Sequence, residues 1–326
     1  MTLLKAESIT VEYPVGAGLL GRAGSLRAVV DVDLTLAAGE CHGLVGESGC
    51  GKSSLGRALL RLTDVTSGRI EFEGRDITHL SARSLRPIRR RMQMIFQDPQ
   101  ASLNPRFTVA QAVAEPLAIH RLAPDRAARA RRVLELLSDV GLDESLADRY
   151  PHELSGGQRQ RVGVARALAV DPCFIVADEP VSALDVSVQA QLLNLLDGLR
   201  SQRELAFLFI SHDLRVVRHL CDRVSVMYLG HIVERAPTAT LFASPRHPYT
   251  RALLRALPSL EPGVPAANRL AGEVPSPLDP PRGCPFHPRC PEKDRPDACF
   301  QTPPPLESCG DDQHVACYVT GLKPQP

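Results

Sequence analysis

The 326-residue sequence has no long apolar run, and no stretch approaches the roughly 18 residues of a membrane-spanning helix. The opening Met1–Lys5 has no signal-peptide pattern, so we expect a soluble, intracellular protein that could still sit on a membrane protein. The formal net charge is only +1, which gives no general attraction to nucleic acid. The composition therefore argues against a membrane-spanning chain and against a nucleic-acid partner.

Lysine is scarce, with only four residues among 38 basic side chains: Lys5, Lys52, Lys293 and Lys323. Arginine is therefore the default cation of the chain. A compact ammonium group suits a loop that closes tightly on phosphate, where a planar guanidinium would not fit. Lys52 stands in Gly46–Ser53, which fits the pattern G-x-x-x-x-G-K-[ST] of phosphate-binding loops.

The neighbours of this loop agree with a phosphate site. Cys41–Val45 predicts a buried strand, and Ser54–Leu62 has a helical pattern. Together they bring free N–H groups and the helix dipole to an anion, whereas an ordinary glycine turn would leave the lysine and serine unexplained. We expect Lys52 to contact the β- and γ-phosphates and Ser53 to bind Mg²⁺. The predicted ATP-binding residues here are Gly46, Glu47, Ser48, Gly49, Cys50, Gly51, Lys52, Ser53 and Ser54.

Strand and helix patterns alternate along the chain. Residues 1 to about 40 predict short strands around a glycine-containing insert, Gly16–Gly24. From about 108 to 170 the pattern is helical, with an apolar stripe from Val133 to Val140 that stops at Gly141. Such alternation predicts a mostly parallel sheet covered on both faces, an α/β fold.

Two apolar runs lead directly into polar residues. Phe174–Ala177 precedes Asp178 and Glu179, and Leu205–Ile210 ends two residues before His212. Ligands of parallel sheets bind at the carboxyl ends of the strands. We therefore expect Asp178 to aim a carboxylate at the bound Mg²⁺ and Glu179 to polarise the attacking water as general base. The alternative is a helix N-terminus decorated with acidic residues.

The order of motifs resembles an ATP-binding cassette (ABC) ATPase over roughly residues 3 to 240. Leu154–Gln158 reads Leu-Ser-Gly-Gly-Gln, the signature of that family, which other phosphate-loop proteins lack. The other matching motifs are Gly46–Ser53, Gln97, Asp178-Glu179, Ser182–Asp185 and His212. The resemblance implies a P-loop NTPase (RecA-like) fold with an N-terminal antiparallel β subdomain and a helical subdomain at about 98–165. It places the ATPase domain at 1–257 and a proline- and cysteine-rich extension at 258–326.

The resemblance also implies roles in hydrolysis. His212 would hydrogen-bond the γ-phosphate and orient water, and Gln97 would contact Mg²⁺ or water and report nucleotide state to membrane subunits. The implied catalytic residues are Glu179, His212 and Gln97, and the implied Mg²⁺ ligands are Ser53, Gln97 and Asp178. Tyr13 either stacks on adenine or simply packs at the end of its strand.

The signature segment implies a second copy of the cassette. Its serine and glycines present a hydroxyl and bare N–H groups at a helix N-terminus, which is an anion site. In the family this segment closes on the ATP of the partner cassette, so that ATP joins the two cassettes and hydrolysis releases them. The residues implied to act on the partner's ATP are Ser155, Gly156, Gly157, Gln158 and Asp185.

Three further segments resemble those of the ATPases of dipeptide and oligopeptide importers, in particular the F-type subunit. They are Ile95–Pro99, Tyr150–Glu153 and His247–Thr250. This implies peptide uptake at the cytoplasmic face of the inner membrane, with a D-type ATPase, two integral-membrane permease subunits and, indirectly, an extracytoplasmic substrate-binding protein as partners. The alternative is a cytosolic ABC-type ATPase that serves an enzyme complex, like the accessory ATPase of carbon–phosphorus lyase.

Five of the nine cysteines lie in the extension, where little apolar sequence is present to form a core. Clustered cysteines in a reducing compartment suggest metal more than disulfides. The spacing C-x₅-C-x₈-C is looser than that of usual zinc sites. The resemblance favours a [4Fe–4S] cluster on Cys284, Cys290, Cys299 and Cys317, with zinc second and Cys309 as a rival fourth ligand. Free cysteines in an unstructured tail are the remaining alternative.

Overall fold

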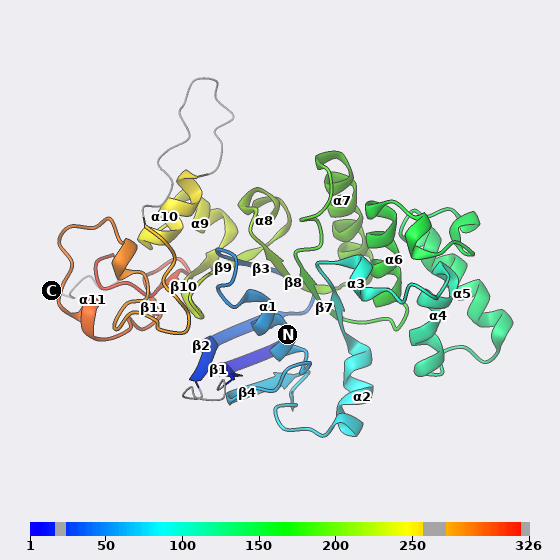
Figure 1. Cartoon of the computed structure of the whole chain (residues 1–326), viewed down its shortest axis with the longest axis horizontal. Coiled ribbons are helices and arrows are strands. Elements are labelled where there is room, and N and C mark those ends of the chain that lie inside the picture. Colours follow the sequence, from blue (N-terminus) through cyan, green and yellow to red (C-terminus); the bar gives the residue numbers. More distant parts are fainter. Residues whose placement is uncertain (17–23, 257–271, 321–326) are drawn as a thin grey trace. The chain divides into compact units, whose positions relative to one another are not determined.

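The structure is a computed structural model that describes residues 1–16, 24–256 and 272–320 (Figure 1). Within these ranges the chain forms two compact units. The first comprises residues 1, 37–40 and 79–210, and the second comprises residues 2–36, 41–78 and 211–326 as far as they are described. Parts of the predicted insert Gly16–Gly24 and of the extension 258–326 lie outside the described residues.

Three parallel strands form the sheet of the first unit: β6 (Met92–Ile95), β7 (Phe174–Asp178) and β8 (Ala206–Ser211), in the order β8-β7-β6. Every residue of β7 is buried, as expected of a strand covered on both faces. Ile175 pairs with Gln93 on one side and with Phe207 on the other. The two strands predicted before Asp178 and His212 are therefore confirmed to within one residue at each end.

Helices make up most of the rest of the first unit. They are α2 (Ala82–Arg91), α3 (Pro99–Ser102), α4 (Val109–Ile119), α5 (Arg126–Asp139), α6 (Gly156–Leu168) and α7 (Val186–Arg203), with the short 3₁₀ turns η1 (Glu144–Leu146) and η2 (Pro151–Glu153). The predicted stripe between Val133 and Val140 is buried along α5, and Gly141 ends it with φ of 67°. Helices α4, α5 and α6 pack against one another (Figure 1), which explains why the stripe faces inward.

In the second unit, one sheet has the order β2-β1-β4-β5. Its strands are β1 (Thr2–Val15), β2 (Gly24–Ala37), β4 (Ser67–Phe72) and β5 (Arg75–Asp76). The prediction of short strands here was wrong, because β1 and β2 each span 14 residues. Ser8 and Asp31 have φ of 50°, a left-handed conformation that interrupts the apolar alternation without ending the strand.

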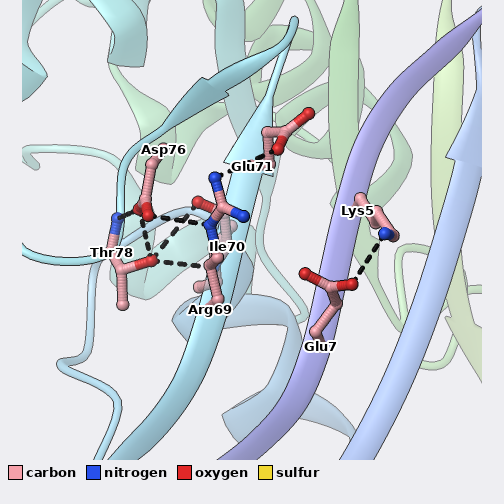
Figure 2. A network of polar contacts seen from close by, with 7 residues as sticks. All are labelled: Lys5, Glu7, Arg69, Ile70, Glu71, Asp76 and Thr78. Carbon is pink, nitrogen blue, oxygen red and sulfur yellow. Dashed lines mark hydrogen bonds and ion pairs between the residues drawn. The ribbon is translucent and has the colours of Figure 1, made fainter.

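Polar contacts tie the edge of this sheet together (Figure 2). The Thr78 hydroxyl donates to Asp76 Oδ1 at 2.6 Å and accepts from the Ile70 N–H at 2.8 Å. Arg69 Nε donates to Asp76 Oδ2 at 2.9 Å. The hydrogen bonds from Thr78, followed by Arg69, lower the pKa of Asp76 to about 2, so this carboxylate stays charged at neutral pH. Lys5 and Glu7 form a separate ion pair of 2.6 Å on β1.

The second sheet of this unit positions the phosphate-loop candidate. Its strands have the order β11-β12-β10-β9-β3. They are β3 (Cys41–Val45), β9 (Arg223–Tyr228), β10 (His231–Pro237), β11 (Glu307–Ser308) and β12 (His314–Val315). The helical elements of the unit are α1 (Lys52–Leu59), α8 (Leu214–Leu220), α9 (Thr238–Ala243), α10 (Pro248–Arg255), η3 (His287–Arg289) and α11 (Ala298–Gln301). Strand β3 is buried throughout and runs parallel to β9.

The described part of the C-terminal extension, residues 272–320, is anchored to this second sheet. Val315 on β12 pairs with Glu234 on β10. The Gln313 side-chain amide donates to Glu234 Oε1 at 2.7 Å, and both residues are buried. Phe286 is fully buried, with its ring centroid 5.2 Å from that of Tyr228 and 5.4 Å from that of Tyr249. The extension thus docks through a few buried contacts in place of a core of its own.

None of the helices within residues 1–16, 24–256 and 272–320 has the length and hydropathy that a membrane crossing requires.

Candidate nucleotide site

The candidate phosphate loop Gly46–Ser53 connects β3 to α1, as the sequence predicts. Two of its glycines are required by the backbone. Gly46 has φ of +155° and Gly51 has φ of +108°, conformations that residues with side chains rarely adopt. A Cβ atom at Gly46 would lie 2.1 Å from Met227 O, and one at Gly51 would lie 2.0 Å from Ala28 O. The loop is therefore closely packed against main chain, and only glycine fits at both positions.

Lys52 turns its side chain back into this loop. Its Nζ donates to Gly46 O at 2.8 Å and to Glu47 O at 2.9 Å, and the residue is only 5% exposed. The ammonium group also lies 3.8 Å from Cys50 Sγ, whose pKa is raised by burial. A cation inside the curve of the loop and backbone N–H groups at the start of α1 together make an anion-binding arrangement.

Glu47 of the loop has hydrogen-bond partners that were not predicted from the sequence. Its backbone N–H donates to the Tyr249 hydroxyl at 2.9 Å. Its carboxylate accepts two hydrogen bonds from Arg289, Nη1 to Oε2 at 2.7 Å and Nη2 to Oε1 at 3.1 Å. The C-terminal extension therefore reaches the phosphate loop directly, across 242 residues of sequence.

Tyr13 lies beside the helix that follows the loop. Its hydroxyl is 3.4 Å from Ser54 Oγ, so the structure brings together the two outermost residues of the predicted ATP site. Tyr13 is partly exposed at the end of β1. Its position is compatible with stacking on a base, which stays a prediction.

The predicted catalytic residues of the first unit cluster at the carboxyl end of β7. Asp178 is the last residue of that strand and is 3% exposed. Glu179 follows with φ of 44°, an uncommon conformation for a residue other than glycine, and its N–H donates to Ile210 O at 3.0 Å. The Gln97 amide donates to Glu179 Oε2 at 3.2 Å. Strained, polar and only partly buried, Glu179 has the features of a functional residue.

His212 follows the end of β8 and is exposed. The neighbouring Asp213 caps α8 by accepting from the Arg215 N–H at 2.9 Å, and its own N–H donates to Ser211 Oγ at 3.0 Å. These bonds fix the turn from which the His212 side chain projects. The predicted role of His212 as a γ-phosphate ligand stays a prediction.

The signature segment forms the N-terminus of α6. Ser155 and Gln158 make a capping box: the Gln158 N–H donates to Ser155 Oγ at 3.2 Å and the Ser155 N–H donates to Gln158 Oε1 at 2.9 Å. A Cβ atom at Gly157 would lie 2.4 Å from Val188 Cγ1, so this glycine allows α6 to approach α7 closely.

Asp185 is the N-cap residue of α7. It accepts from the Val188 N–H at 3.0 Å and from the Ser187 hydroxyl at 2.7 Å, and these bonds lower its pKa. The residues assigned to the partner's nucleotide therefore also fix two helix N-termini.

Four cysteines of the extension share one small cavity. It is lined in part by Cys284, Cys290, Cys299 and Cys317. Burial raises the pKa of the Cys284 thiol to about 12, and the three other thiols add to the rise. Cys309 lies apart from this set, with its Sγ 3.3 Å from Gln313 O. The structure thus groups the four predicted ligands and separates the rival Cys309 from them.

Within the described residues, no group of three or more His, Cys, Asp or Glu side chains is arranged to hold a metal ion.

Comparisons with known proteins agree with the geometry. The model of the ABC transporter family matches residues 29–182, which include the phosphate loop, the signature and Asp178-Glu179. The model of the C-terminal region of oligopeptide/dipeptide transporters matches residues 233–299, which include Tyr249, Arg289 and three of the four clustered cysteines.

Full-length relatives are also similar. A protein named as a probable peptide ABC transporter ATP-binding protein of Sinorhizobium fredii is 53% identical over 319 residues, 97% of this chain and 90% of that protein. The oligopeptide transport ATP-binding protein AppF of Bacillus subtilis is 48% identical over 323 residues, 98% of this chain and 97% of that protein.

Among solved structures, the ATP-binding cassette MJ0796 in a dimeric post-hydrolysis state with ADP and Pi has a TM-score of 0.66 and 30% identity. The match covers 72% of this chain and 99% of that one. A cassette of the CbiONQ transporter from Clostridium perfringens has a TM-score of 0.64 and 26% identity, over 74% of this chain and 91% of that one. The protein is a P-loop ABC ATPase and belongs to the family of ATP-binding subunits of oligopeptide/dipeptide ABC transporters.

Proposed function

We propose that this chain is the ATP-hydrolysing subunit of an importer that takes up dipeptides or oligopeptides, and that it works peripherally at the cytoplasmic face of the membrane. The observation that carries the proposal is the combination of a cassette with the C-terminal region of oligopeptide/dipeptide transporters in one chain. Relatives that match 97% and 98% of this chain are named for peptide or oligopeptide transport. The carbon–phosphorus lyase alternative has no support from these relatives.

In the proposed mechanism, the Lys52 ammonium exchanges its hydrogen bonds to the carbonyls of Gly46 and Glu47 for hydrogen bonds to the β- and γ-phosphates of ATP. Glu179 accepts a proton from the attacking water, while His212 holds that water in line with the γ-phosphate. The strained backbone of Glu179 and its hydrogen bond from Gln97 support this role, because both orient the carboxylate. Gln97 would then sense whether a γ-phosphate is present.

Mg²⁺ would be held by Ser53, Gln97 and Asp178. Their hydroxyl, amide and carboxylate oxygens suit this hard cation, and Asp178 is a buried acid at a strand end, where a cation would balance its charge. When bound, Mg²⁺ neutralises charge on the phosphate oxygens.

The signature implies a second cassette, and the importer-like segments imply the other partners. We infer that Ser155, Gly156, Gly157, Gln158 and Asp185 contact the ATP of a second cassette, and that this second cassette is a D-type ATPase. ATP-bound and released states of the pair would then drive two permease subunits that receive substrate from a binding protein. The dimeric state of the similar cassette MJ0796 is compatible with this pairing.

Affinity purification of the tagged chain from its own membranes tests the proposed assembly. We expect a second ATPase and two polytopic membrane proteins to co-purify, and vesicles that contain the assembly to take up a labelled peptide only when ATP is supplied. Recovery with a soluble enzyme complex and no membrane protein would contradict the transporter assignment.

We further propose that the cysteine cavity holds a [4Fe–4S] cluster on Cys284, Cys290, Cys299 and Cys317. Four cysteine thiolates are the usual ligands of such a cluster, and the spacing C-x₅-C-x₈-C is looser than that of usual zinc sites. Three of the four cysteines are buried, and all four line one cavity. When bound, the cluster supplies crosslinks that would stabilise an extension with little core of its own.

Iron analysis of anaerobically purified protein tests this site. We expect brown protein with visible absorption and about four iron ions per chain, the content of the proposed [4Fe–4S] cluster. Cys299→Ser should lose the iron, whereas Cys309→Ser, the matched control, should keep it. Colourless protein without iron, or Cys309→Ser protein that loses iron to the same extent as Cys299→Ser, would refute the assignment.

A further inference from the structure

We propose that Arg289 of the C-terminal extension sets the ATP affinity of the cassette by neutralising Glu47 of the phosphate loop. This role is distinct from any cluster on the neighbouring cysteines. It rests on the proposed binding of ATP at Gly46–Ser53, and it makes the extension a working part of the nucleotide site.

The contact between Arg289 and Glu47 is a two-bond, charge-assisted pair. The two N–H···O distances are 2.7 and 3.1 Å, and the guanidinium is 5% exposed against 27% for the carboxylate. A planar guanidinium matches a carboxylate in this bidentate way, and lysine cannot. The pair fixes the direction of the Glu47 side chain as well as balancing its charge.

A buried aromatic cluster holds Arg289 in place. The Tyr228 hydroxyl accepts from Arg289 Nη1 at 3.4 Å, and the guanidinium carbon lies 5.9 Å from the Tyr228 ring centroid. The Tyr228 and Tyr249 rings are 4.7 Å apart, and both pack on Phe286. Tyr249 also accepts from the Glu47 N–H. The extension and α10 therefore hold both the side chain and the main chain of one loop residue.

Glu47 is adjacent in sequence to Gly46 and shares the loop with Lys52, whose Nζ contacts the Glu47 carbonyl. A carboxylate at this position would repel the phosphates of ATP and would compete for the Lys52 ammonium. Arg289 prevents both effects, because its charge cancels that of Glu47 and its fork holds the carboxylate. Nucleotide affinity thus depends on an arginine 242 residues away.

The test is a double-mutant cycle on the purified assembly, with affinity measured calorimetrically for a non-hydrolysable ATP analogue in the presence of Mg²⁺. Arg289→Gln should weaken binding by about 10- to 100-fold and raise KM, while kcat at saturating ATP stays close to that of the wild type. Adding Glu47→Gln to Arg289→Gln should restore affinity to within about threefold of the wild type, because no unpaired carboxylate remains. Arg251→Gln is the matched control. It breaks a 2.9 Å ion pair between Arg251 on α10 and Glu292 of the extension, neither of which is a phosphate-loop residue.

The affinity of Glu47→Gln alone is a test that does not depend on whether Arg289→Gln folds. Glu47→Gln should bind the analogue as tightly as the wild type or more tightly, because the main chain of the loop is unchanged and the charge of Arg289 is no longer balanced by a carboxylate at position 47. Tenfold weaker binding by Glu47→Gln, unchanged affinity of Arg289→Gln, or a double variant as weak as Arg289→Gln would each overturn the proposal.

Lys52→Ala separates this proposal from the one it rests on. If Lys52→Ala loses the analogue while Arg289→Gln binds normally, the ATP site stands and only the neutralising role of Arg289 fails. If Lys52→Ala binds as the wild type does, the proposed ATP site itself is wrong.

Discussion

We expect the Glu179→Gln variant to bind ATP as the wild type does and to hydrolyse it about 10²- to 10⁴-fold more slowly, the range by which a general base accelerates a reaction. The amide keeps the shape and the hydrogen-bonding capacity of the side chain but cannot accept the proton of water. The backbone of Glu179, with φ of 44°, and its hydrogen bond from Gln97 both restrict the side chain, so the loss is expected in kcat and not in nucleotide affinity.

A matched control is available in the same unit. Glu204 is also a glutamate with a left-handed backbone, φ of 52°, at the C-terminal end of α7, and it is exposed. Glu204→Gln makes the same chemical change in the same backbone conformation, and its hydrolysis rate should stay within about twofold of the wild type. Steady-state phosphate release and equilibrium binding of ATP are the two measurements. Hydrolysis by Glu179→Gln at the wild-type rate would remove Glu179 from the role of base.

Local patterns in the sequence were enough to predict the parts of the site that lie on contiguous stretches. Gly46–Ser53 and the strand ahead of it encode a strand, a turn and a helix within a few residues, and the structure places them so. The ends of β7 and β8 were predictable for the same reason, because continuous apolar runs specify buried strands.

The contact of Glu47 with Arg289 and Tyr249 was not predictable in this way. These partners lie 242 and 202 residues from Glu47. Arg289 is one of many arginines, and the importer-like segment His247–Thr250 does not indicate which residue Tyr249 contacts. Their choice depends on how the extension docks on β9 and β10, which is a property of the tertiary fold. The long strands β1 and β2 were missed because Ser8 and Asp31 interrupt the alternation.

The capping of α6 by its signature residues did have a sequence signal. Serine at position 155 followed by glutamine three residues later is the capping-box pattern, and the structure contains both of its hydrogen bonds. The signature serine can therefore be replaced by aspartate without loss of the helix cap, because aspartate and serine are both favourable N-cap residues.

The Ser155→Asp variant should fold and bind ATP in its own phosphate loop but lose hydrolysis by about 100-fold or more. Aspartate at the N-cap still accepts from the Gln158 N–H, so the start of α6 is preserved. Its negative charge, however, would face the γ-phosphate of the partner's ATP, where Ser155 is proposed to donate a hydrogen bond. Ser155→Thr is the control, since it keeps both the cap and the hydroxyl, and it should retain most of the activity.

The shared nucleotide is the central claim, and the steady-state ATPase rate of the purified two-cassette assembly tests it most directly. The N-cap serine of the signature is changed to aspartate in both ATPase subunits at once, and the circular dichroism of the assembly is recorded to confirm that its helices remain. Each subunit should still bind ATP, while hydrolysis by the assembly should be abolished. Hydrolysis at the wild-type rate in that doubly changed assembly would contradict the central claim.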